Sequence, residues 1–63
     1  MNGQVKMLNK DKRFGFIRAG KDEYFFHESA LKNCAFDELE KGREVTFEET
    51  EGAKGLRAED IYV

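Results

Sequence analysis

Aromatic and histidine side chains recur at alternate positions in two short segments of this chain. The first segment holds Phe14 and Phe16, and the second holds Phe25 and His27. Because alternate residues of a β-strand project from the same face, each pair would present two flat rings together. Unpaired nucleic-acid bases stack on exposed rings of this kind, each contributing about 1–3 kcal/mol with little preference for sequence. Binding by stacking is therefore the chemistry that the pattern offers.

Basic side chains are concentrated before and around the first aromatic pair. Residues 1–21 carry six basic side chains and one acidic one, whereas residues 22–63 carry five basic and twelve acidic ones, and the formal net charge is −2. The overall charge argues against a nucleic-acid ligand. The uneven distribution can nevertheless make one face of a small protein basic. On charge alone, a pattern that only serves solubility explains the asymmetry equally well.

The elements that must position these side chains are predicted to be five short strands. They cover residues 4–8, 14–17, 23–27, 44–48 and 56–63, with turn-forming residues at 9–12, 19–22 and 51–55. Within residues 28–42 we expect one helical or 3₁₀ turn at 29–32 and a loop over 36–43. Five strands without a long helix in 63 residues predict an all-β fold, a small closed or nearly closed antiparallel barrel forming a single domain over residues 1–63.

The periodicity leaves the orientation of the two aromatic strands open. In one arrangement Ile17, Tyr24 and Phe26 form the core, and the aromatic pairs and His27 lie outside. In the inverted arrangement the aromatic pairs are buried, as phenylalanines usually are, and Phe26 is exposed while the imidazole of His27 is buried. Gly15, between two rings, is interpreted as a point where the backbone of a ligand approaches closely.

Several other classes of protein and site are disfavoured. Cys34 is the only cysteine, so the chain has no disulfide framework or thiolate cluster for zinc, and a passive thiol in a reducing, cytoplasmic setting is expected. No apolar run approaches the roughly 20 residues of a membrane span. His27 is the only histidine, which disfavours a metal site, and no nucleophile is paired with a base. We therefore expect no cofactor, no catalysis and no small-molecule substrate.

A resemblance to a known family decides between the two orientations. The segment Lys12-Arg13-Phe14-Gly15-Phe16-Ile17 resembles the first ribonucleoprotein motif, K-G-F-G-F-I, of cold-shock domains, and Phe25-Phe26-His27 resembles the second, F-V-H. Residues 5–9, 29–31, 39–42 and 45–48 stand in the family's order and spacing. The resemblance implies an oligonucleotide/oligosaccharide-binding (OB) barrel of five antiparallel strands that stacks single-stranded RNA or DNA on its outer face.

The resemblance also implies roles for particular residues. It assigns stacking to Phe14, Phe16, Phe25, His27 and Phe36, backbone contacts to Lys6, Lys12 and Lys54, and a polar contact to Asn9. Arg13 and Arg57 replace a glycine and a glutamine of the pattern, and each adds a cation near the rings. Met7 stands where the family has a stacking tryptophan, and Glu28 stands where a further aromatic is usual. We therefore expect a weaker binder than the family norm, and a strained turn if Arg13 needs a positive φ.

The sequence thus predicts a single-stranded RNA- or DNA-binding domain, with a possible role as an RNA chaperone or as a regulator of transcription or translation. The alternative is a barrel with weakened nucleic-acid affinity that binds a protein partner. Three departures from the family pattern, Met7, Leu8 and Glu28, favour it, because a patch with Met and Phe in place of Trp suits an apolar partner. A monomer is expected, with a strand-swapped dimer as the other possibility.

Overall fold

Five strands and two short 3₁₀ helices make up the described chain, residues 1–52 and 55–63 of a computed structural model. The strands are β1 (Asn2–Asn9), β2 (Phe14–Ala19), β3 (Asp22–His27), β4 (Glu44–Gly52) and β5 (Gly55–Tyr62). The 3₁₀ helices η1 (Glu28–Ala30) and η2 (Phe36–Glu38) lie between β3 and β4. No helix in the described ranges has the length and apolar character needed to cross a membrane.

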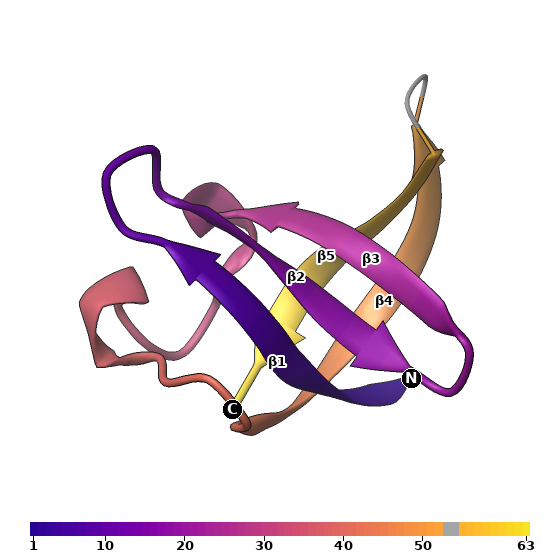
Figure 1. The fold of residues 1–63 in the computed structure, drawn as a ribbon, viewed down its shortest axis with the longest axis horizontal. Coiled ribbons are helices and arrows are strands. Elements are labelled where there is room, and N and C mark those ends of the chain that lie inside the picture. Colours follow the sequence, from indigo (N-terminus) through magenta and orange to yellow (C-terminus); the bar gives the residue numbers. More distant parts are fainter. Residues whose placement is uncertain (53–54) are drawn as a thin grey trace.

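The strands close into a barrel in the order β1-β2-β3-β5-β4 (Figure 1). Antiparallel pairing joins β1 to β2, β2 to β3, β4 to β5 and β1 to β4. The predicted all-β, five-stranded barrel is confirmed. One pairing departs from the antiparallel rule, because β3 and β5 run parallel where Phe25 lies opposite Arg57. This short contact closes the barrel, and closure is how small barrels avoid edge-to-edge aggregation.

The interior of the barrel takes every second residue of the strands. Ile17, Tyr24 and Phe26 are fully buried at the centre of the core. The remaining buried hydrophobic residues come from the other strands and from the segment between β3 and β4: Val5, Ala30, Phe36, Leu39, Val45, Phe47, Ala58 and Ile61. Since Tyr24 and Phe26 point inward, the inverted arrangement is wrong, and Phe14, Phe16, Phe25 and His27 lie on the outer face of β2 and β3.

The segment between β3 and β4 is more regular than a loop. Helix η1 matches the turn expected near residue 29, whereas η2 forms where a loop was predicted. Three hydrogen bonds hold η2. Ala35 and Glu38 bond reciprocally, the Ala35 backbone N–H donating to Glu38 Oε1 and the Glu38 N–H to the Ala35 carbonyl, both at 3.0 Å, and the Leu39 N–H donates to the Phe36 carbonyl at 3.1 Å. Phe36 and Leu39 are both buried, so burial of two apolar side chains fixes a turn that has no helical periodicity in the sequence.

Gly15 is buried on the inner side of β2, which corrects its interpretation as a ligand approach point. A Cβ at this position would lie 2.5 Å from the Met7 carbonyl oxygen and 2.9 Å from the Phe26 ring. The missing side chain therefore lets β1 and a core ring approach the backbone of β2 closely. Its role is packing within the barrel.

Candidate nucleic-acid interface

Four side chains from four strands form a row across the outer face of the barrel. Strand register places Met7 opposite Phe16, Phe16 opposite Phe25, and Phe25 opposite Arg57. In a second row, Asn9 lies opposite Phe14, which lies opposite His27. We call Phe14, Phe16, Phe25 and His27 the aromatic platform; β2 and β3, which carry it, lie side by side in Figure 1.

The three phenylalanine rings of the aromatic platform contact one another. The Phe14 and Phe25 ring centroids lie 5.5 Å apart with 33° between their planes, and the Phe16 and Phe25 centroids lie 5.8 Å apart at 70°. Phe14 and Phe16 meet edge to face at 6.2 Å. All three rings remain partly exposed. Because the rings support one another, little conformational freedom is left to lose when a flat ligand stacks on them.

His27 is held in place by the helix that follows it. The Ser29 backbone N–H donates to His27 Nδ1 at 3.2 Å, and the Ser29 hydroxyl lies 3.1 Å from the same nitrogen. Since Nδ1 accepts, the neutral ring carries its proton on Nε2. The imidazole therefore caps η1 with one nitrogen and offers a donor with the other, at the edge of the aromatic platform.

Arg13, which replaces a glycine of the family motif, has the positive φ that would strain a residue with a side chain. Its φ is +59°, in the left-handed region. Nη1 lies 2.8 Å from Asp37 Oδ1 and 3.8 Å from Glu28 Oε2, and the guanidinium carbon lies 5.9 Å from the centre of the Phe36 ring. The cation expected to meet phosphate is thus shared between two carboxylates of the same chain.

Phe36 lies in the core, which corrects the expectation that it is exposed for stacking. Its exposed fraction is 3%, and its ring packs 6.3 Å from that of Phe26. With Arg13 over its ring, a base cannot reach it in this conformation. Phe36 therefore anchors η2 to the barrel.

The other predicted contact residues that the structure describes differ in their exposure and in the partners that they contact. Lys6 forms an ion pair with Glu23, and Met7 is 38% exposed. Lys12 is exposed in the turn between β1 and β2, and Lys54 falls outside the described residues. Asn9 uses its side-chain oxygen within the same turn, accepting from the backbone N–H groups of residues 11 and 12 at 3.1 Å each. Its predicted polar contact must therefore be made by the amide nitrogen.

Arg57 borders the aromatic platform on the side of β5. Its guanidinium carbon lies 5.6 Å from the centre of the Phe25 ring, within cation–π range. Its Nη2 also lies 3.9 Å from Glu59 Oε1. The planar guanidinium therefore extends the row of rings, and bases stack on such planes as well as on aromatic rings.

Comparison with known proteins gives matches that cover nearly the whole of this chain. The chain matches the family of the "'Cold-shock' DNA-binding domain" over residues 1–63. The chain belongs to the cold-shock domain family. It is 44% identical over 62 residues to "Cold shock-like protein CspB" of Bacillus cereus, covering 97% of this chain and 95% of that protein. It is 43% identical over 61 residues to "Cold shock protein CspD" of Bacillus subtilis strain 168, covering 95% and 92%. It is 41% identical over 63 residues to "Cold shock protein CapB" of Pseudomonas syringae pv. tomato, covering 97% and 90%.

Of the acidic partners of this cold-shock domain's basic residues, Glu28 was singled out from the sequence, whereas Glu23 and Asp37 were not predicted. Glu23 could have been found, because it alternates with Phe25 and His27 and so shares their outward face. Asp37 carried no such signal, since it lies in η2, 24 positions from Arg13. These acids place negative charge directly beside the cations that border the aromatic platform.

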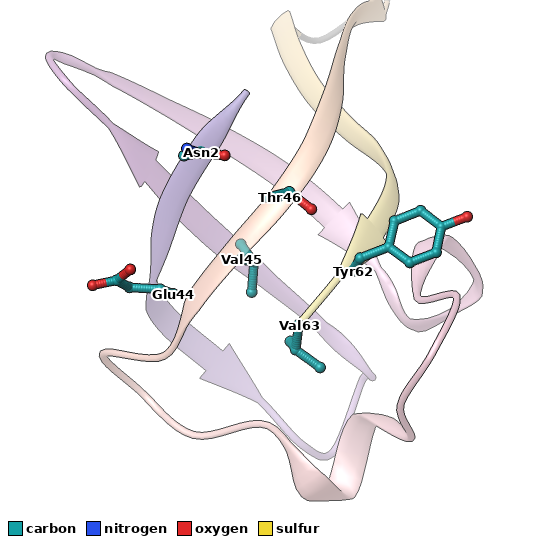
Figure 2. A pocket seen from close by; sticks show the side chains of 6 residues that line it. All are labelled: Asn2, Glu44, Val45, Thr46, Tyr62 and Val63. Atoms are coloured by element: carbon teal, nitrogen blue, oxygen red, sulfur yellow. The ribbon is translucent and has the colours of Figure 1, made fainter.

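A hollow away from the aromatic platform offers no comparable chemistry. It is lined by residues at the ends of β1, β4 and β5: Asn2, Glu44, Val45, Thr46, Tyr62 and Val63. Figure 2 shows Glu44 and Tyr62, its carboxylate and its phenol, on opposite sides. No cluster of three His, Cys, Asp or Glu side chains suited to a metal ion occurs within residues 1–52 and 55–63. Burial raises the pKa of the Cys34 thiol, so that it is less reactive than an ordinary cysteine.

Proposed function

We propose that this cold-shock domain binds single-stranded RNA or DNA by stacking unpaired bases on the aromatic platform. The observation that carries the proposal is the cluster of three mutually packed, partly exposed phenylalanine rings on β2 and β3. These rings lie on the outer face and are not part of the buried core, and every base has a face that stacks on such rings. Family membership favours this function over the protein-interaction alternative.

Basic side chains at the edges of the aromatic platform supply the contacts to phosphate. Lys12 is exposed beside Phe14, while Lys6 and Arg57 each have a neighbouring carboxylate that a phosphate must displace. Two or three phosphate contacts to a single strand give a slope of log K against log salt of about −1.4 to −2.1. Raising salt from 50 to 200 mM then weakens binding about 7- to 18-fold by the same relation.

Binding of unpaired bases has a consequence for folded RNA. A ligand that binds the open strand and not the hairpin shifts the equilibrium toward the open form by mass action. The domain would therefore act as a non-catalytic RNA chaperone or as a regulator of transcription or translation. Melting a labelled RNA hairpin with and without saturating protein tests this role, and an unchanged melting temperature would exclude it.

We further propose that the protein acts as a cytoplasmic monomer without a cofactor or small-molecule substrate. A single, weakly reactive Cys34 suits a reducing compartment. The closed barrel gives the chain a complete core of its own. Sedimentation at concentrations above those of the binding assay distinguishes the monomer from a strand-swapped dimer.

Fluorescence anisotropy of a labelled heptathymidine, titrated at 50 and 200 mM salt, tests the binding function. We expect micromolar or tighter binding that weakens with salt, and much weaker binding to a DNA duplex long enough to stay paired under the assay conditions. The duplex is the control, because its bases are already stacked and a purely electrostatic ligand would favour its denser phosphates. Absence of binding below about 1 mM would overturn the proposal and favour the protein-interaction alternative. Apolar contacts to a protein partner would not weaken with salt.

A further inference from the structure

One end of the aromatic platform is occupied by a cluster of charged side chains from three segments. Arg13 precedes β2, Glu28 follows β3, and Asp37 lies in η2. The Glu28 backbone N–H donates to the Arg13 carbonyl at 3.0 Å. This hydrogen bond fixes the two residues beside each other, next to Phe14 and His27 at the end of the second row.

Within this cluster two carboxylates surround one guanidinium. Arg13 Nη1 lies 2.8 Å from Asp37 Oδ1 and 3.8 Å from Glu28 Oε2. The site therefore has a net charge of −1, whereas Lys6 and Glu23 at the other end of the face form a one-to-one pair. The side chains of Arg13, Glu28 and Asp37 are 42%, 43% and 67% exposed. Ion pairs this exposed contribute little to stability, so the acids can be neutralised without unfolding the barrel.

We propose that Glu28 and Asp37 limit the affinity and the footprint of this domain by neutralising Arg13 and repelling phosphate. This inference rests on the proposed function. A strand that stacks on Phe14 and His27 brings its next phosphate to this end, where it meets two carboxylates whose cation is already paired. The backbone of the ligand therefore leaves the surface here, and Arg13 contributes little to binding despite its position.

The same arrangement closes off Phe36. The guanidinium of Arg13 lies over the Phe36 ring while Asp37, the next residue in the chain, holds it by a hydrogen bond. Removing the carboxylate of Asp37 frees the guanidinium to turn toward a phosphate. The acidic pair thus determines whether the cation faces inward to its own chain or outward to a ligand.

The test neutralises both acids with isosteric amides, Asp37→Asn and Glu28→Gln, in one variant. Binding of labelled oligothymidines of four to nine nucleotides is measured across a range of salt concentrations. One gained phosphate contact steepens the slope of log K against log salt by about 0.7. Relative to 1 M salt, where such a contact adds nothing, this corresponds to about 8-fold tighter binding at 50 mM and about 3-fold at 200 mM. We also expect the length at which affinity stops rising to increase by about one nucleotide.

The control for net charge is Glu44→Gln, which removes one carboxylate at the start of β4. Glu44 lies opposite Gln4 of β1 in the sheet, and Gln4 lies three residues before Met7, which is about 10 Å along an extended strand. A long-range effect of net charge would tighten binding in this variant too. We expect it to change affinity less than about 2-fold, since a single charge about one Debye length from Met7 interacts only weakly through water at these salt concentrations.

A second variant asks whether Arg13 responds as the proposal requires. Arg13→Gln keeps the stem over Phe36 and removes the charge. We expect it to weaken wild-type binding slightly, because Glu28 and Asp37 lose the cation that they share, and to weaken the Asp37→Asn, Glu28→Gln variant more, cancelling its gain. Equal losses in both backgrounds would mean that Arg13 already binds phosphate, and would overturn the inference.

The outcomes separate this inference from the function on which it rests. If the wild type binds, and the Asp37→Asn, Glu28→Gln variant has the same affinity and salt slope, then the proposed role of Glu28 and Asp37 is wrong while the proposed function stands. Wild-type protein that does not bind overturns the proposed function, and this inference with it. Urea unfolding of every variant shows whether a change in affinity reflects binding or loss of the fold.

Discussion

Replacing Met7 with tryptophan should convert this domain into a tighter binder. Met7 is 38% exposed on β1 and lies opposite Phe16, at the β1 end of the row that continues through Phe25 to Arg57. Side chains in directly opposed positions have their Cβ atoms about 4.5–5.5 Å apart, so an indole at position 7 adds a ring beside Phe16. One added stack contributes about 1–3 kcal/mol, which corresponds to about 5- to 160-fold in affinity.

The Met7→Trp variant also supplies its own assay. The chain contains no tryptophan, so the new indole reports on this position alone when unlabelled heptathymidine is added. We expect saturable quenching at a lower ligand concentration than wild type needs in the anisotropy assay. Tyr62→Trp is the control, because Tyr62 is exposed on β5 and lines the hollow of Figure 2. Unchanged affinity together with unquenched emission of Met7→Trp would refute the idea that position 7 belongs to the stacking surface.

Three further predictions concern stability. Gly15→Ala should lose about 1–3 kcal/mol in urea unfolding, because its Cβ would lie 2.5 Å from the Met7 carbonyl oxygen; wild-type stability would refute the packing role. Arg13→Gly should be about 1 kcal/mol more stable than Arg13→Ala, because both lack the guanidinium but only glycine accepts a φ of +59° freely; equal stability would refute the strain. A hydrogen bond to Glu49 raises the pKa of Tyr24 from 10.0 to about 12, so the unfolded chain loses this proton first and folding is weakened as pH rises from 10 to 12. The stability difference between wild type and Tyr24→Phe should narrow over that range, and a constant difference would contradict the shifted pKa.

Much of the fold could be predicted because strand periodicity applies wherever one face is buried. Residues 14–17 and 23–27 alternate between outward-facing and core positions, and strands β2 and β3 include both runs. Periodicity alone could not say which face is inside, since both faces carry large apolar side chains. The family resemblance supplied that choice, and the full burial of Ile17, Tyr24 and Phe26 confirms it.

Features fixed by long-range contacts could not be predicted in the same way. Phe36 is buried because η2 folds onto the barrel beside Phe26, and a single turn of 3₁₀ helix has no repeat in the sequence. Gly15 was misinterpreted because a glycine allows either a ligand or another part of the protein to approach the backbone closely. Here the Met7 carbonyl of β1 and the Phe26 ring of the core occupy the space. The parallel contact of Phe25 with Arg57 likewise depends on how the barrel closes.

The central claim is that Phe16 and Phe25 face outward to bind bases, and one pair of variants tests it most directly. Affinity for labelled heptathymidine and stability in urea should be measured together for Phe16→Ala and Phe25→Ala, with the core variant Phe26→Ala as the control. We predict that each platform variant loses about 1–3 kcal/mol of binding free energy while it still folds, whereas Phe26→Ala loses about 3–5 kcal/mol of stability. Folded platform variants that bind as tightly as the wild type would contradict the account.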